Sequence, residues 1–147
     1  MYEKAFVYGF EKLEVWKLSR NLNKLVYDIT DNFPYKENKN LTSQIRRSSV
    51  SVAANIAEGS SKFSKKDFNR YLKISFGSAI ELLSHLYLAF DQGYIKENTL
   101  LEIKHRINVI TKMLNSLSRS LLLKWILIID TSTHRLIDIN NYSIDNN

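Results

Sequence analysis

The sequence predicts an all-α protein, an antiparallel up-down four-helix bundle followed by a C-terminal segment that the pattern leaves poorly assigned. Three observations predict this fold. Only four glycines and one proline occur among 147 residues, and so few turn-forming residues allow few turns. Apolar residues recur three and four positions apart over four successive stretches, which is the period of an amphipathic helix. The connections between the stretches are short, and helices joined in this way pack as antiparallel neighbours.

The first two helices are expected over residues 13–32 and 37–58. The apolar period of the first ends at Phe33, because Pro34 disfavours helix at the residue before it. The second is expected to end at Gly59, since glycine suits the left-handed C′ position after a helix.

The third helix is expected to start after Ser64, whose hydroxyl can accept a backbone hydrogen bond as an N-cap. Asp67, three positions later, completes a variant of the capping box. Gly93 ends this helix. Asn98 is the expected cap of a fourth helix, whose apolar period reaches Leu117.

We expect one bundle domain over residues 1–120 and a C-terminal extension over residues 121–147. The apolar period can be continued through Leu121 and Trp125, yet the same run is rich in β-branched and aromatic residues, so both helix and strand stay open. The polar end of the chain is expected to be frayed or disordered.

Composition excludes several classes of function. The chain has no cysteine, which excludes disulfide scaffolds, zinc ribbons and thiol catalysis and favours a cytoplasmic location. There is no signal-peptide pattern, and the longest apolar run has nine residues, whereas a membrane span needs about 20. His85, His105 and His134 lack metal-ligand spacing, and no nucleophile or phosphate-loop motif occurs. We therefore expect no membrane partner, catalytic residue, metal, cofactor or small-molecule substrate.

Polar residues of the second helix gather beside its apolar stripe. Gln44, Arg47, Asn55 and Glu58 fall on one side at 100° per residue. One interpretation is a structural network in which Arg47 and Glu58 satisfy each other and neighbouring helices. The alternative is a ligand or partner site.

Small apolar residues mark the far side of the same helix, where another helix could approach closely. They are Val50, Ala53 and Ala57. Contact from two sides predicts a homo-oligomer with these residues in the interface.

Basic residues are concentrated between residues 36 and 73. This stretch holds nine basic and three acidic residues, and the difference equals the net charge of +6. Lys66, Arg70 and Lys73 follow one face of the third helix, and such a face suits phosphate. The expected nucleic-acid-binding residues are Lys62, Lys65, Lys66, Arg70, Lys73 and Arg46. A merely solvated helix face is the alternative.

Several strings resemble a known family. They include Leu13-Glu14-Val15-Trp16, Asn55-Ile56-Ala57-Glu58-Gly59 and Phe68-x-x-Tyr71-Leu72. The chain resembles, from Phe10 to Leu117, the 23S ribosomal RNA intervening-sequence proteins, small bacterial proteins related to the accessory variability determinant of diversity-generating retroelements. The resemblance implies an antiparallel four-helix bundle that assembles as a homopentamer, with nucleic acid as the expected partner. It implies no established activity.

Two hypotheses for function follow. The first is a non-enzymatic homo-oligomeric bundle that binds RNA or DNA through its basic surface. The second is a protein interaction or scaffold module without nucleic-acid contact, because an acidic protein surface requires the same lysines and arginines as phosphate does. The sequence shows no groove-reading motif and no aromatic platform, so weak discrimination between nucleic-acid sequences is expected.

Overall fold

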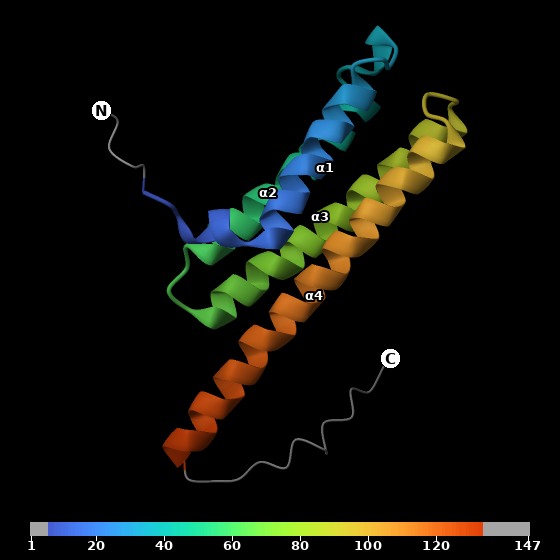
Figure 1. The fold of residues 1–147 in the computed structure, drawn as a ribbon. Coiled ribbons are helices and arrows are strands. Elements are labelled where there is room, and N and C mark those ends of the chain that lie inside the picture. Colours follow the sequence, from blue (N-terminus) through green and yellow to red (C-terminus); the bar gives the residue numbers. More distant parts are fainter. Residues whose placement is uncertain (1–5, 134–147) are drawn as a thin grey trace.

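Four helices pack against one another in the computed structural model, which describes residues 6–133 and their side chains up to residue 123. They are α1 (Glu14–Thr30), α2 (Leu41–Ser60), α3 (Lys65–Asp91) and α4 (Glu97–Thr133). Successive helices run in opposite directions (Figure 1), and each contacts its chain neighbours while α1 also contacts α4. The predicted all-α four-helix bundle is confirmed.

Aliphatic side chains from all four helices fill the core between them. Each helix turns its apolar stripe inward, since residues three and four positions apart share one face. The largest fully buried side chains include Leu22, Ile45, Ile56, Leu72, Leu82, Leu86, Ile103, Ile107, Ile110 and Leu114. This shared core packs α3 against α2.

The start of α2 differs from the prediction. The helix begins at Leu41, and a 3₁₀ turn over Tyr35–Glu37 precedes it. Asn40 has φ −112° and ψ −113°, which is not helical, and its N–H donates to the carbonyl of Glu37 at 2.9 Å. This hydrogen bond completes the turn before α2 starts.

Gly59 does not have the predicted left-handed conformation. It is buried inside α2, which continues to Ser60. A Cβ atom at Gly59 would lie 2.6 Å from the Cβ atom of Tyr71 in α3. Glycine is present here because the two helices approach closely.

Gly93 ends α3 as predicted. It has φ 72°, the left-handed conformation that glycine adopts without strain. Its N–H donates to Phe90 at 2.8 Å, and the N–H of Tyr94 donates to Ala89 at 2.9 Å. These two bonds form a Schellman motif, which satisfies the last carbonyls of the helix.

The caps at the start of α3 and α4 behave differently. Ser64 is the N-cap of α3, and its hydroxyl accepts a hydrogen bond from the N–H of Asp67 at 3.1 Å. Helix α4 starts at Glu97, so Asn98 lies in the first turn and is not the cap. Its side-chain oxygen accepts from the N–H of Thr99 at 2.8 Å.

Helix α4 is continuous across residue 121 and extends past the α2–α3 turn (Figure 1). Of the two conformations left open for the start of the extension, the structure has helix up to Thr133. The predicted frayed end beyond it lies outside the described residues, and the division at residue 120 stays a prediction. Over residues 6–133, no helix combines the length and apolarity needed to cross a membrane. Among the side chains described, up to residue 123, no group of three acidic or histidine residues could hold a metal ion.

Candidate nucleic-acid interface

The close approach of α2 to α3 at Gly59 places Tyr71 beside Glu58. The hydroxyl of Tyr71 donates to Oε1 of Glu58 at 2.8 Å. Nζ of Lys62 reaches the same oxygen at 3.3 Å. Residues from the end of α2, the turn and the first part of α3 are therefore joined in one polar cluster.

Two cations lie over the aromatic ring of this cluster. Nζ of Lys62 is 4.9 Å from the centre of the Tyr71 ring, and Cζ of Arg70 is 5.2 Å from it. Aromatic rings attract cations at such distances. Tyr71 thus gathers two of the predicted phosphate-binding residues at the α2–α3 turn.

Hydrogen bonds in the cluster favour its charged forms. The bond from Tyr71, followed by that from Lys62, lowers the pKa of Glu58 below its ordinary value of 4.5. The bond to Glu58 raises the pKa of Lys62 above its ordinary value of 10.5. Both groups are charged at neutral pH.

Four other predicted cations on α3 form no ion pair with a carboxylate of the described residues. They are Lys65, Lys66, Arg70 and Lys73, and all but the half-buried Lys65 are exposed. Lys66, Arg70 and Lys73 share one side of α3, because they are four and three positions apart. We call Lys62, Lys65, Lys66, Arg70 and Lys73 the basic face.

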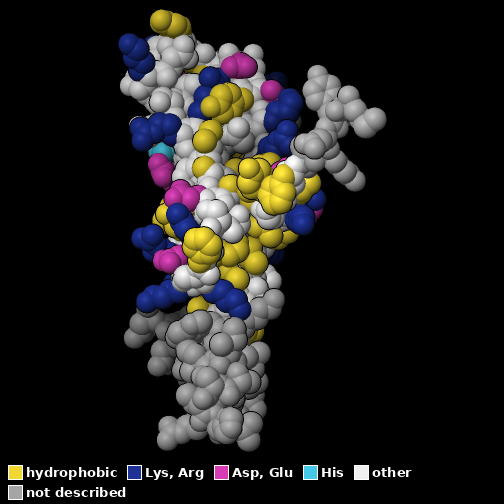
Figure 2. Space-filling model, turned by 90° about the vertical axis from the view of Figure 1, so that its left-hand side faces the viewer, with side chains coloured by type: hydrophobic (Ala, Val, Ile, Leu, Met, Phe, Trp, Pro, Cys, Tyr) yellow, Lys and Arg dark blue, Asp and Glu magenta, His cyan; other side chains and the backbone are white. Residues whose placement is uncertain are grey.

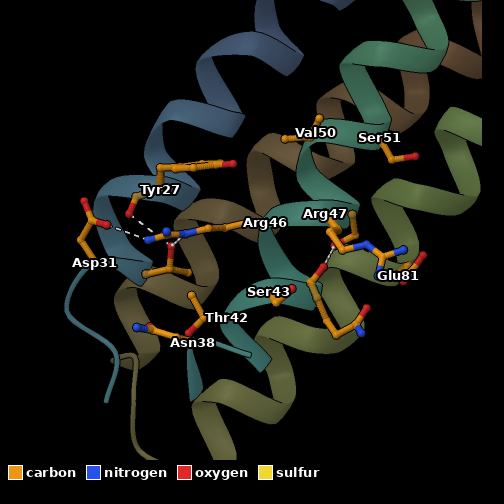
Figure 3. A pocket seen from close by; sticks show the side chains of 13 residues that line it. Tyr27, Asp31, Asn38, Thr42, Ser43, Arg46, Arg47, Val50, Ser51 and Glu81 are labelled. Atoms are coloured by element: carbon orange, nitrogen blue, oxygen red, sulfur yellow. Dashed lines mark hydrogen bonds and ion pairs between the residues drawn. The ribbon is translucent and has the colours of Figure 1, made fainter. Parts of the chain in front are cut away.

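Arg46 does not belong to the basic face. Its Nε donates to Oγ1 of Thr30 at 2.8 Å, and its terminal nitrogen pairs with Asp31 at 2.6 Å. The guanidinium also lies over the ring of Tyr27 at 4.6 Å (Figure 3). Arg46 lies twelve residues before Glu58 in α2, about 18 Å along the helix axis. The structure assigns it to the α1–α2 contact.

The expected network on α2 is not formed between Arg47 and Glu58. These residues are eleven positions apart, about 16 Å along the axis, and both are exposed. Arg47 points toward Glu81 on α3 (Figure 3), whereas Glu58 binds Tyr71 and Lys62. Positions that share a helix side on a wheel can still be several turns apart.

Asn55 belongs to a separate contact between α2 and α3. Its amide donates to the carbonyl of Ser51 at 2.8 Å and to the Ser51 hydroxyl at 3.0 Å. That hydroxyl is 2.8 Å from the hydroxyl of Ser78 in α3. Gln44 is exposed and, together with Arg47, lines a polar groove over the first half of α2.

This polar groove has a volume of about 890 Å³ and lies over the first half of α2 (Figure 3). Residues of α1, α2 and α3 line it, including Tyr27, Asp31, Arg47, Val50 and Glu81. Its two arginines stand near two carboxylates, so its charge is mixed and it does not extend the basic face.

Comparison with known proteins gives a family. The family model of the 23S rRNA-intervening sequence protein matches residues 11–116. The chain belongs to this family. A crystal structure of a protein of unknown function from the S23 ribosomal protein family of Bacteroides thetaiotaomicron is similar, with 27% identity and a TM-score of 0.65. The similarity covers 71% of this chain and 97% of that one. No curated protein matches the sequence.

In this intervening-sequence protein, the residues expected at an oligomer interface differ in exposure. Val50 is 44% exposed and lines the polar groove. Ala53 and Ala57 are half-buried. Of these three residues, Val50 is thus the most accessible to a second copy of the chain.

The structure shows an exposed aromatic residue at the basic face, which the sequence analysis did not predict. Phe63 lies in the turn between α2 and α3, and its side chain is fully exposed. The signal in the sequence is a phenylalanine between Lys62 and Lys65, outside the apolar period of either helix.

Proposed function

We propose that this intervening-sequence protein is a non-enzymatic homo-oligomer, with five copies favoured by the family resemblance, that binds RNA or DNA through phosphate contacts on its basic face. One observation carries the proposal. Lys65, Lys66 and Lys73 lie in the first nine residues of α3, and none of them forms an ion pair with a carboxylate of the described residues. Uncompensated cations on rigid elements attract phosphate.

Figure 2 shows the charged and hydrophobic side chains on one side of the molecule. Lysine and arginine side chains there lie mostly around the edges, and hydrophobic side chains gather in the middle. Elsewhere Lys17, Lys24 and Arg106 pair with carboxylates one helical turn away. An assembly of several copies would repeat the basic face and multiply its phosphate contacts.

The test is the salt dependence of binding. Fluorescence anisotropy with labelled RNA and DNA should give affinities that fall steeply as salt rises. Each phosphate contact adds about 0.9 to the slope of log K against log salt for duplex DNA, and about 0.7 for single strands. Replacing Lys66, Arg70 and Lys73 by glutamine should reduce this slope by about 2–3 and weaken binding to every sequence.

A matched control changes the same net charge elsewhere. Lys39, Lys96 and Lys112 are exposed and form no ion pair with any described residue. Replacing these three lysines by glutamine should leave most of the affinity intact. Equal losses in the two triple variants would show that net charge acts without a site, and absence of binding at low salt would overturn the proposal.

A second candidate function is a protein scaffold without nucleic-acid contact. Exposed apolar side chains on the outer sides of α3 and α4 favour it: Ile80 is 46%, Leu88 50% and Leu101 55% exposed. Exposed apolar surface of this kind often marks protein contacts. Sequencing of nucleic acid that co-purifies with the native protein separates the two functions, because the scaffold should carry none.

A further inference from the structure

We propose that Phe63 is a stacking platform for one unpaired base, so that the basic face selects single-stranded over duplex nucleic acid. The proposal deepens the proposed function and rests on it. Its starting point is the full exposure of the Phe63 ring, although phenylalanine is among the residues most often buried.

Hydrogen bonds between residues close along the chain hold both ends of the turn that carries this ring. At its start, the N–H of Ser61 donates to Glu58 and the N–H of Lys62 donates to Gly59, both at 3.1 Å. At its end, Ser64 caps α3. Phe63 stands between these two anchors, so hydrogen bonds hold the backbone on either side of it.

The exposure of Phe63 is not shared by the next phenylalanine. Phe68 is partly buried and packs against the core, and its ring would lie 2.8 Å from a Cβ atom at Gly59. The contact of Phe68 with α2 fixes how α3 begins. The turn therefore has its own hydrophobic anchor, and Phe63 is not needed for packing.

Three lysines, Lys62, Lys65 and Lys66, lie within three positions of Phe63 along the chain. Lys62 and Lys65 are at most two residues from Phe63, so their Cα atoms lie within about 8 Å of its own. The ammonium of Lys62 is held near Tyr71 and Glu58, while Lys65 and Lys66 form no ion pair with a described carboxylate. A positive surface combined with an exposed aromatic ring is the arrangement that binds single strands.

The choice of single strands follows from the chemistry of stacking. In a duplex both faces of each internal base already contact neighbouring bases, and exposing one costs a few kcal/mol. An unpaired strand offers a free face to the Phe63 ring while its phosphates reach the lysines. Every base has such a face, so the expected preference concerns strandedness and not sequence.

The experiment compares Phe63→Ala and Phe63→Trp with the wild type on three labelled probes. These are a thymidine oligonucleotide, an abasic strand of equal length and a DNA duplex. Phe63→Ala should weaken binding to the thymidine strand by about 5- to 150-fold, the equivalent of one stacked base. Binding to the abasic strand and the duplex should change little, because only phosphate contacts remain there. Phe63→Trp should retain single-strand affinity, and bases should quench its added fluorescence.

Tyr35→Ala provides the matched control. Tyr35 is 88% exposed and adjacent to Lys36, but it lies at the other end of α2. Its removal should leave single-strand binding unchanged.

The outcomes separate the inference from the proposed function. If Phe63→Ala binds the thymidine strand as wild type does, while the glutamine variant of Lys66, Arg70 and Lys73 loses it, stacking is refuted and phosphate binding stands. A wild type that binds no probe refutes both. A Phe63→Ala protein with altered mass in light scattering but unaltered binding assigns the ring to a protein contact and overturns the inference.

Discussion

The hydroxyl of Tyr71 in α3 donates a 2.8 Å hydrogen bond to the carboxylate of Glu58 in α2. The bond forms because Gly59, the residue after Glu58, lets the two helix backbones approach. It fixes a carboxylate among the cations of the basic face. The same contact also holds Lys62 at the turn, through the oxygen that both donors share.

Stability should depend on pH through Glu58. Its lowered pKa means that the folded state binds fewer protons near that pKa than the unfolded state, so the contribution is present above pH 4.5 and is lost as pH falls through the lowered value. Tyr71→Phe removes the largest cause of the shift. Thermal melts between about pH 7 and pH 3 should show a difference between wild type and variant that shrinks at low pH. A difference that is constant with pH would assign the effect to packing.

Adding a methyl group at Gly59 should destabilise the bundle. Gly59→Ala places a Cβ atom 2.6 Å from that of Tyr71, and overpacking of this kind costs about 1–3 kcal/mol. Gly77→Ala is the matched control, because a Cβ atom at Gly77 meets nothing within 4 Å. The helix preference of alanine should make that variant more stable by about 0.5–1 kcal/mol. Urea denaturation measures both, and equal effects would contradict the close approach.

Arg46 and Arg47 are adjacent in sequence but should respond differently to truncation. Arg46→Ala removes the contacts with Thr30 and Asp31, and we expect a loss of about 1–2 kcal/mol, since part of the site is exposed. Arg47→Ala should change stability by less than about 0.5 kcal/mol, because this exposed side chain has no ion pair among the described residues. Urea denaturation would show the difference. A large loss for Arg47→Ala would indicate that it is buried in an assembly.

Oligomerisation through α2 predicts a mass several times that of the 17.2 kDa chain in light scattering. Val50→Glu should dissociate the assembly, because it places a charge in an interface that would otherwise exclude water. Val50 tests this better than the half-buried Ala53, where glutamate could also disturb the bundle. An unchanged circular dichroism spectrum with a monomeric mass is the expected result. A monomeric wild type at high concentration would remove the assembly from the proposal.

Local chemistry was sufficient to predict the helices and two of their ends. The apolar period requires only neighbours three and four positions apart, and the bonds of Ser64 and Gly93 span only a few residues. Such features can be read from sequence because every atom involved is close along the chain. The clustering of Lys66, Arg70 and Lys73 on one side of α3 follows for the same reason.

The partners of the polar residues were decided by tertiary structure. Arg46 binds a residue 15 positions away, and Glu58 binds one 13 positions away. Both partners lie outside α2, so a helical wheel of α2 cannot show either contact. Gly59 shows the same limit, because a glycine near a helix end suits both a left-handed cap and a close helix contact. Interactions between residues close along the chain determine where helices form. The contacts of Arg46, Glu58 and Gly59 depend instead on how α1 and α3 pack against α2, and all the core side chains together determine that packing.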